Sequence, residues 1–191
     1  PPDAAQEAVI GSLCRAGDEI LAVGGPAAVA RWRSIGNRLN VQVAVLEVPF
    51  GTSLSLPNLE EMLAQHPGVR VVCLSLSDAE SGSLTDLAAI ATIMDGGSWL
   101  TVVDACLGLC ADDLRMDEWH IDIALSSSDS GVMAPPGLSL VAVGSRAREA
   151  LDSTTGSAVA GTYLDLRTHI GGERSPHLPA PALTGLFVAV R

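Results

Sequence analysis

The chain has 191 residues, of which 48% are hydrophobic and 3% aromatic, and its formal net charge is −11. Such a chain is long enough to bury a sizeable core in one domain, and its acidity argues against nucleic acid because phosphate backbones would be repelled. No apolar run approaches the ~18–20 residues that span a bilayer, and no signal-peptide pattern is visible. We therefore expect a cytoplasmic globular protein that binds neither membranes nor nucleic acid.

The first part of the chain alternates helical stretches with short apolar runs. In chain order it predicts a helix over residues 4–16, a strand over 19–23, a helix over 27–39, a strand over 41–48 and a helix over 57–65. Gly17 ends the first helix. Pro57 stands in the first turn of the third helix, where its missing N–H costs nothing.

The second part continues the alternation. It predicts a strand over 69–76, a helix over 84–94, strands over 100–103, 121–125 and 138–143, and a short helix over 146–151. Residues 69–76 form a nearly continuous apolar run, as expected of a strand covered on both faces. Ser83 or Thr85 is the expected N-cap of the helix over 84–94. The apolar tail 181–191 predicts the start of one more helix.

Short buried strands alternating with helices predict an α/β fold with three layers, in which a mostly parallel sheet carries helices on both faces. In such sheets ligands bind at the carboxyl ends of the strands. The junctions expected to carry function are therefore residues 24–26, 77–82, 104–108 and 126–131.

The cysteines predict no metal site. Each stands in an apolar setting, which is typical of a small buried hydrophobe. Cys106 and Cys110 are spaced C-x3-C with no His close by, and this spacing matches structural zinc sites poorly. We expect all four thiols to be buried: Cys14, Cys73, Cys106 and Cys110.

Two consecutive motifs carry a resemblance to a known family. Residues 117–126 read DEWHIDIALS, and residues 133–138 read MAPPGL. Together with GDEIL at 17–21 and VVDA at 102–105, they resemble the large domain of class V (fold type I) aminotransferases, the alanine–glyoxylate and serine–glyoxylate group. The resemblance implies a pyridoxal-phosphate-dependent fold, with residues 1–191 as a single large domain that lacks the family's N-terminal arm and C-terminal small domain.

The same resemblance places Ser130 where the family has the lysine that forms an imine with the cofactor aldehyde. A hydroxyl cannot form an imine, and all eleven basic residues are arginine, so no other lysine can replace it. We therefore expect no catalytic residue here and no covalent attachment of pyridoxal phosphate. The cofactor contacts that the resemblance assigns as vestigial are Asp104, Glu80, Ser128, Arg174 and His177. Asp104 matches the aspartate that pairs with the pyridine nitrogen.

Further departures affect the expected phosphate and ring contacts. Residues 2–7 match the family's glycine-rich phosphate turn but contain no glycine, and Asp3 would repel an anion there. Residues 24–27 offer no aromatic ring to cover the pyridine. Asp129 replaces the glutamine that usually precedes the lysine.

Three functions fit these observations. The first is an aminotransferase-like pseudoenzyme that acts as a binding, scaffolding or regulatory subunit, in a homodimer or with a larger subunit. The second is the lysine-free subunit of a heteromeric aminotransferase. The third is a cofactor-free enzyme that uses Asp78, Glu80, Asp104 and Asp129 as acid and base groups, whose clustering would raise their pKa values. The serine-rich run 126–130 is either a nucleophile or phosphorylation cluster or, as we expect, a polar loop.

Overall fold

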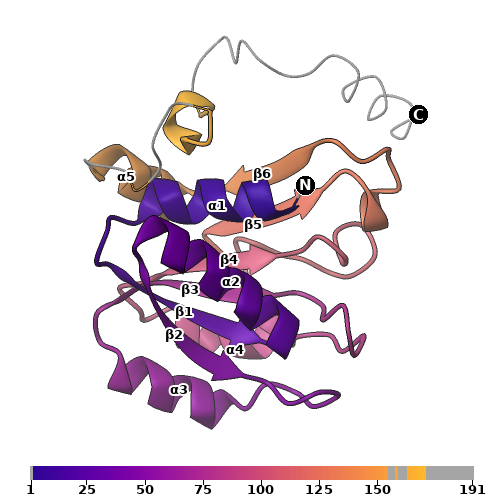
Figure 1. The fold of residues 1–191 in the computed structure, drawn as a ribbon. Coiled ribbons are helices and arrows are strands. Elements are labelled where there is room, and N and C mark those ends of the chain that lie inside the picture. Colours follow the sequence, from indigo (N-terminus) through magenta and orange to yellow (C-terminus); the bar gives the residue numbers. More distant parts are fainter. Residues whose placement is uncertain (1, 155–157, 159–162, 171–191) are drawn as a thin grey trace.

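The computed structural model describes residues 2–154, 158 and 163–170, and its centre is one six-stranded sheet (Figure 1). The strands lie in the order β2-β1-β3-β4-β5-β6. Their bounds are β1 Glu19–Gly24, β2 Gln42–Glu47, β3 Val69–Ser75, β4 Leu100–Asp104, β5 Ile123–Ser127 and β6 Ser139–Val143. The first five strands are parallel to their neighbours, and β6 pairs with β5 in the antiparallel direction. The predicted mostly parallel sheet is thus confirmed.

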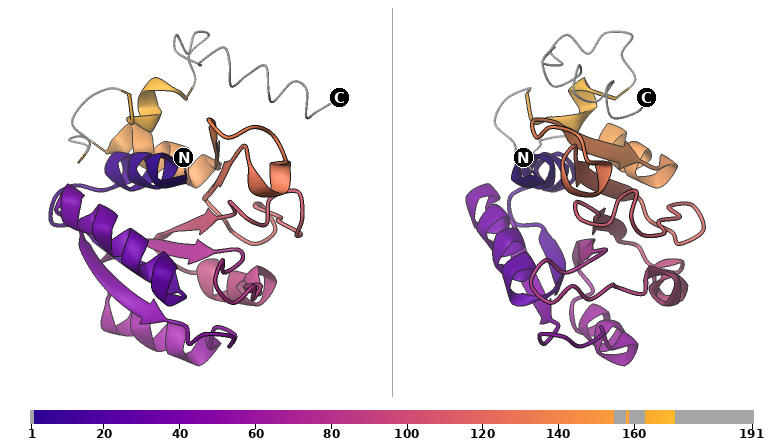
Figure 2. Two further views of the ribbon diagram at one scale, coloured as in Figure 1. Left: turned by 45° about the vertical axis from the view of Figure 1, so that its right-hand side comes forward. Right: turned by 90° about the vertical axis from the view of Figure 1, so that its right-hand side faces the viewer.

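Helices cover both faces of the sheet, which confirms the three layers (Figures 1 and 2). Their bounds are α1 Pro2–Leu13, α2 Pro26–Leu39, α3 Leu56–Gln65, α4 Leu87–Met94 and α5 Ser145–Ser153. Helices α1, α2 and α5 pack into the hydrophobic core on one face, and α3 and α4 pack into the core on the other. Two 3-10 turns follow β5 and α5 in the chain, η1 Ser130–Val132 and η2 Leu166–Thr168.

Strand β1 shows why the sheet is buried from both sides. Ile20 and Ala22 belong to the core under α1 and α2, whereas Leu21 and Val23 belong to the core under α3 and α4. Alternate side chains of a strand point to opposite faces, so an apolar residue at every position serves both cores. This explains why the strand reads as a continuous apolar run rather than an alternating one.

Two predicted helix ends are wrong, and local hydrogen bonds explain both. Helix α1 ends at Leu13 instead of residue 16 because the Asp18 carboxylate accepts the N–H of Arg15. Helix α4 begins at Leu87 instead of residue 84, since Leu84 pairs with Ser77 in an isolated antiparallel bridge. Its N-cap is therefore neither Ser83 nor Thr85.

The N-cap of α4 is Asp86, whose carboxylate accepts the N–H of Ala89. Strand β5 also begins later than predicted, at Ile123 instead of residue 121. Asp122 lies just before it and accepts the backbone N–H of Thr101 with its carboxylate.

Three cysteines are buried as predicted, but Cys110 is exposed. Its φ of 71° places it in a turn that leaves the core. No helix in the described part of the chain is long and apolar enough to cross a membrane. The helix predicted at 181–191 lies outside the described residues.

Candidate functional site

A cavity of about 200 Å³ opens at the carboxyl ends of the strands, beside α1 and α2. Residues that end or follow β3, β4 and β5 form one wall, and α1 and α2 form the other. The lining comprises Gln6, Ala27, Ala28, Arg31, Ser75, Ser77, Asp78, Ala79, Asp104, Cys106, Leu107, Ser127, Asp129 and Ser130. Three of the four junctions chosen from the sequence therefore converge on one place. The fourth, residues 24–26, does not line the cavity, but the next residues, Ala27 and Ala28, do.

Asp104, the expected partner of a pyridine nitrogen, is already hydrogen-bonded within the chain. The Gln6 side chain donates from Nε2 to Asp104 Oδ2 at 2.6 Å. The backbone N–H of Cys106 donates to Asp104 Oδ1 at 3.0 Å. Both carboxylate oxygens are thus fixed by protein donors that lie on the cavity wall.

Gln6 was missed by the sequence reasoning. It is polar and buried on a helix whose other inward residues are Ala, Val, Ile and Leu together with Ser12. A lone amide on an apolar helix face is the signal that could have identified it, because buried polar groups are normally hydrogen-bonded. Its partner Asp104 lies 98 positions away, which no local pattern reveals.

Asp78 lies on the wall but is held by its own loop. Ser81 donates to Asp78 Oδ2 from its backbone N–H at 2.8 Å and from its hydroxyl at 2.5 Å. These bonds lower the pKa of the Asp78 carboxyl below its ordinary value. The expectation that clustered carboxylates raise one another's pKa is therefore wrong for Asp78, because two local donors stabilise its charged form.

Glu80 is exposed and does not line the cavity. Of the four carboxylates in the cofactor-free hypothesis, the structure therefore brings together Asp78, Asp104 and Asp129. Arg174 and His177 lie outside the described residues.

Ser130, which the resemblance matches to the family lysine, is exposed and lines the cavity next to Asp129. Its φ of 54° is left-handed, a conformation that favours glycine. Gly131 follows, and a Cβ there would collide with the carbonyl oxygen of Leu109. The loop is therefore pressed against the residues that follow β4.

Ser128 belongs to the scaffold of this loop rather than to the cavity wall. It is buried, donates its hydroxyl to Pro135 O at 2.7 Å and accepts the N–H of Leu138 at 3.2 Å. The hydroxyl thus joins the two ends of the turn between β5 and β6. The prediction of a polar loop over 126–130 is wrong at its start, because Ser126 and Ser127 are buried at the end of β5.

Cys106 is a poor nucleophile in this setting. Burial, followed by the negative charge of Asp104, raises the pKa of its thiol far above the ordinary value. The thiolate is the reactive form of cysteine. The Cys106 thiol therefore fills space in the cavity wall and does not act as a nucleophile.

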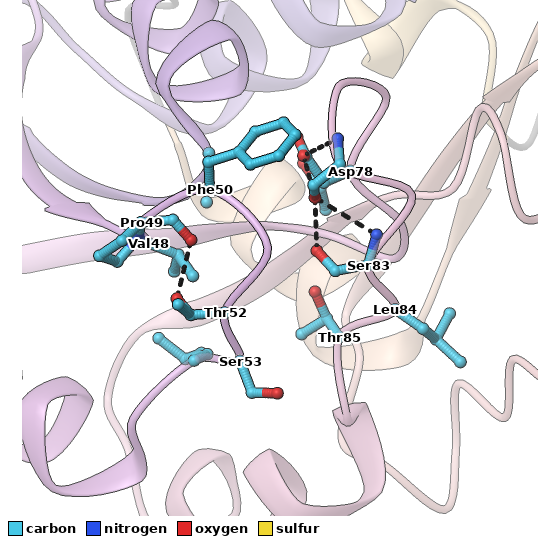
Figure 3. A pocket seen from close by; sticks show the side chains of 14 residues that line it. Val48, Pro49, Phe50, Thr52, Ser53, Asp78, Ser83, Leu84 and Thr85 are labelled. Carbon is cyan, nitrogen blue, oxygen red and sulfur yellow. Dashed lines mark hydrogen bonds between the residues drawn. The ribbon is translucent and has the colours of Figure 1, made fainter.

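A second, much smaller hollow of about 30 Å³ lies between the loop after β2 and the loop after β3 (Figure 3). Thr52 donates its hydroxyl to Pro49 O at 2.7 Å on one side. On the other side the backbone N–H of Asp78 donates to Ser83 O at 2.9 Å. Its volume suits about one water molecule, so the cavity of about 200 Å³ is the candidate site.

The donor set of this cavity does not match pyridoxal phosphate. The cofactor needs a primary amine for its aldehyde and positive or N–H groups for its phosphate. At the position where the resemblance leads us to expect the amine, the cavity has the hydroxyl residue Ser130, and Asp129 also lines the wall. Asp3 lies in the first turn of α1, where an anion would otherwise be favoured.

The comparisons with known proteins agree with the fold. The model of the aminotransferase class-V family matches residues 4–173. The chain is 30% identical over 185 residues to the L-aspartate–glyoxylate aminotransferase of Paracoccus denitrificans, covering 95% of this chain and 46% of that protein. It is also 30% identical over 165 residues to the serine–glyoxylate aminotransferase of Arabidopsis thaliana, covering 83% of this chain and 41% of that protein.

The same similarity appears among solved structures. The alanine–glyoxylate aminotransferase of Nostoc sp. superposes with a TM-score of 0.85 at 28% identity, covering 99% of this chain and 50% of that one. The chain thus spans about half the length of the relatives it matches. By sequence and by fold, the chain belongs to the class V aminotransferase family.

Proposed function

We propose that this chain is a non-catalytic member of the class V aminotransferase family, which acts as a binding, scaffolding or regulatory subunit. The observation that carries the proposal is Ser130 at the lysine position, in a chain of 191 residues without lysine. Imine formation requires a nucleophilic amine, and a serine hydroxyl does not supply one. The lysine's second task, moving a proton at the cofactor's carbon, is lost with it.

The cavity wall supports the proposal independently of the lysine. Asp129 and Asp78 place negative charge on the wall of the cavity in which the family resemblance would put an anionic cofactor. Asp104 is bound by Gln6 and by the Cys106 N–H. A cofactor would therefore meet charge repulsion in addition to the missing amine.

The test compares the wild-type chain with a Ser130→Lys variant. Each is incubated with pyridoxal phosphate and reduced with borohydride, and any adduct is located by mass spectrometry of peptides. We expect no adduct within the wild-type cavity, and an adduct at residue 130 in the variant in low yield. A stoichiometric adduct in the wild-type cavity, or transamination by the purified wild-type chain, would overturn the proposal.

A second candidate is the lysine-free subunit of a heteromeric aminotransferase. It is favoured by large apolar side chains left exposed beside the cavity, since Met133 is 85% and Leu107 42% exposed. Exposed apolar groups at a site are typical of a surface that another chain covers. Purification with a lysine-bearing chain of the same fold, and activity only in the mixture, would support this candidate. A stable homo-oligomer would contradict it.

A further inference from the structure

Large apolar side chains that face solvent are concentrated at one edge of the sheet. Strands β1 to β5 run parallel, so the loops that leave their carboxyl ends lie along the same edge. Of the five large hydrophobic residues exposed in the described part of the chain, four lie in these loops. In the order β2, β3, β4 and β5 they are Phe50, Leu84, Leu107 and Met133. Single exposed apolar residues are normal, but several along one edge are typical of a surface that another molecule covers.

The four loops form one continuous surface. The first two of these apolar residues line the smaller hollow (Figure 3), and Leu107 lines the larger cavity. Asp78 lines both, so the two hollows are adjacent. The loop that contains Met133 meets the segment after β4, because a Cβ on Gly131 would lie 3.2 Å from the carbonyl oxygen of Leu107. From β2 to β5 the edge spans four strand spacings, or about 19 Å.

The same four loops carry carboxylates and no basic residue. Over residues 48–55, 76–86, 105–112 and 128–138 the sequence contains no Arg, Lys or His. The acidic residues in these ranges are Asp78, Glu80, Asp86, Asp112 and Asp129. The edge therefore combines exposed apolar groups with charge of one sign.

Three of these carboxylates are not neutralised within the described structure, where Glu80, Asp112 and Asp129 form no ion pair. Arg31 of α2 reaches the cavity, but its guanidinium lies 3.5 Å from the Asp3 carboxylate. A second copy placed edge to edge would bring the same loops, so like charges would oppose each other. The net charge of −11 on each chain adds to this repulsion. A different protein with a basic surface is therefore the better complement.

We propose that the carboxyl edge of the sheet docks a basic segment of another protein, whose apolar side chains cover the exposed apolar residues and whose Lys or Arg side chains meet the loop carboxylates. An apolar centre with a charged rim is the usual anatomy of such interfaces. A helix of about 13 residues would cross the edge. The inference rests on the proposed function of a binding subunit, and adds to it the surface and the kind of partner.

The probes are two labelled peptides of about 18 residues, five helical turns, with leucine along one face. The other face carries lysine in one peptide and glutamate in the second. Fluorescence anisotropy measures the binding of each peptide to the full chain. We expect saturable binding of the lysine peptide and none of the glutamate peptide. The affinity for the lysine peptide should fall as salt is added, because salt screens surface charges.

Matched substitutions locate the binding. Phe50→Ser and Met133→Ser each remove one exposed apolar side chain from the edge, and each should weaken the lysine peptide about fivefold or more. Tyr163→Ser is the control, since this aromatic residue is 71% exposed against 70% for Phe50 and lines neither hollow. Glu80→Gln should weaken the peptide about twofold. Glu149→Gln, at an exposed position in α5, should leave the affinity unchanged.

Three results would overturn the inference: no saturable binding of the lysine peptide, equal or tighter binding of the glutamate peptide, or an affinity that falls no more in the two edge variants than in Tyr163→Ser. Analytical ultracentrifugation of the chain alone tests the competing occupant. A wild-type dimer that Phe50→Ser and Met133→Ser dissociate would assign the edge to a second copy, and would also overturn the inference.

Circular dichroism shows whether each variant is folded, and edge positions in two separate loops keep the test valid if one variant is not. The proposed function fails on a different result, the covalent adduct with pyridoxal phosphate. The two failures are therefore distinguishable.

Discussion

The sheet interior and the loops at its carboxyl edge differ in the side chains they contain and in the role of those side chains. In β1 and β3 most side chains are apolar and buried. In the loops that follow the strands, carboxylates line a cavity, and non-glycine residues such as Ser130, Met133 and Cys110 take positive φ. The difference teaches that a family fold depends on the interior, whereas its chemistry depends on a few edge residues that can change without loss of the sheet.

The largest effect that tests this contrast is expected in the interior. Leu74 in β3 is almost completely buried, whereas Leu84 in the following loop is 56% exposed. Leu74→Ala removes buried methyl groups and leaves a cavity, so it should lower the free energy of unfolding by about 2–5 kcal/mol. Leu84→Ala makes the identical change at the edge and should cost less than about 0.5 kcal/mol. Urea denaturation of both variants measures the difference, and similar costs would remove the distinction between the two regions.

Ser128→Ala tests whether the edge loops contain a structural framework of their own. The substitution leaves Pro135 O and the Leu138 N–H without their hydroxyl partner. We expect a loss of about 1–3 kcal/mol, the usual cost of an unsatisfied buried group. Ser53→Ala, at an exposed position, is the control for removing a hydroxyl. A loss no larger than that of the control would show that the Ser128 bonds are dispensable.

Asp86→Ala addresses the boundary between the regions, where the loop after β3 enters α4. The Asp86 carboxylate accepts the Ala89 N–H at 2.9 Å, so the variant should lose about 1 kcal/mol of stability. Ser55 caps α3 with a longer bond of 3.4 Å from the Asn58 N–H. Ser55→Ala should therefore cost less, and thermal denaturation of the two variants tests this order.

The contrast also explains what the sequence could and could not predict. Apolar runs in the strands predicted the sheet, because burial on both faces dictates their composition. The same reasoning misplaced the start of α4. Leucine is a common helix residue, but Leu84 pairs with Ser77 in an isolated antiparallel bridge and therefore lies outside the helix. Helix propensity alone contains no information about that pairing.

For the site, the family resemblance led to Ser130, Asp104 and Asp129, all of which line the cavity. It did not lead to Gln6, because the bond to Asp104 joins two elements far apart in the chain. It also misassigned Ser128, whose hydroxyl turns back into its own loop. A motif identifies which positions are near a site, but side-chain direction depends on backbone conformation that the motif does not record.

The smallest expected effect is a change of folding stability with pH, and it is compared between one aspartate from each region. Burial raises the pKa of the Asp122 carboxyl, although the Thr101 N–H and Arg146 partly oppose the shift. A raised pKa in the folded state means that protonation favours folding. Its contribution to stability is therefore present below the unfolded pKa of about 3.9, and is lost as pH rises through the folded value.

Asp78 behaves in the opposite sense, because the bonds from Ser81 lower its pKa. Its contribution is present above the unfolded pKa and is lost as pH falls through the folded value. Relative to the wild-type chain, Asp122→Asn should therefore lose stability on acidification from neutral pH to about pH 4. Asp78→Asn should be less stable than wild type at neutral pH, and its deficit should shrink at still lower pH. Urea denaturation across this range measures both, and parallel pH profiles for the two variants would show that buried and edge carboxylates do not differ.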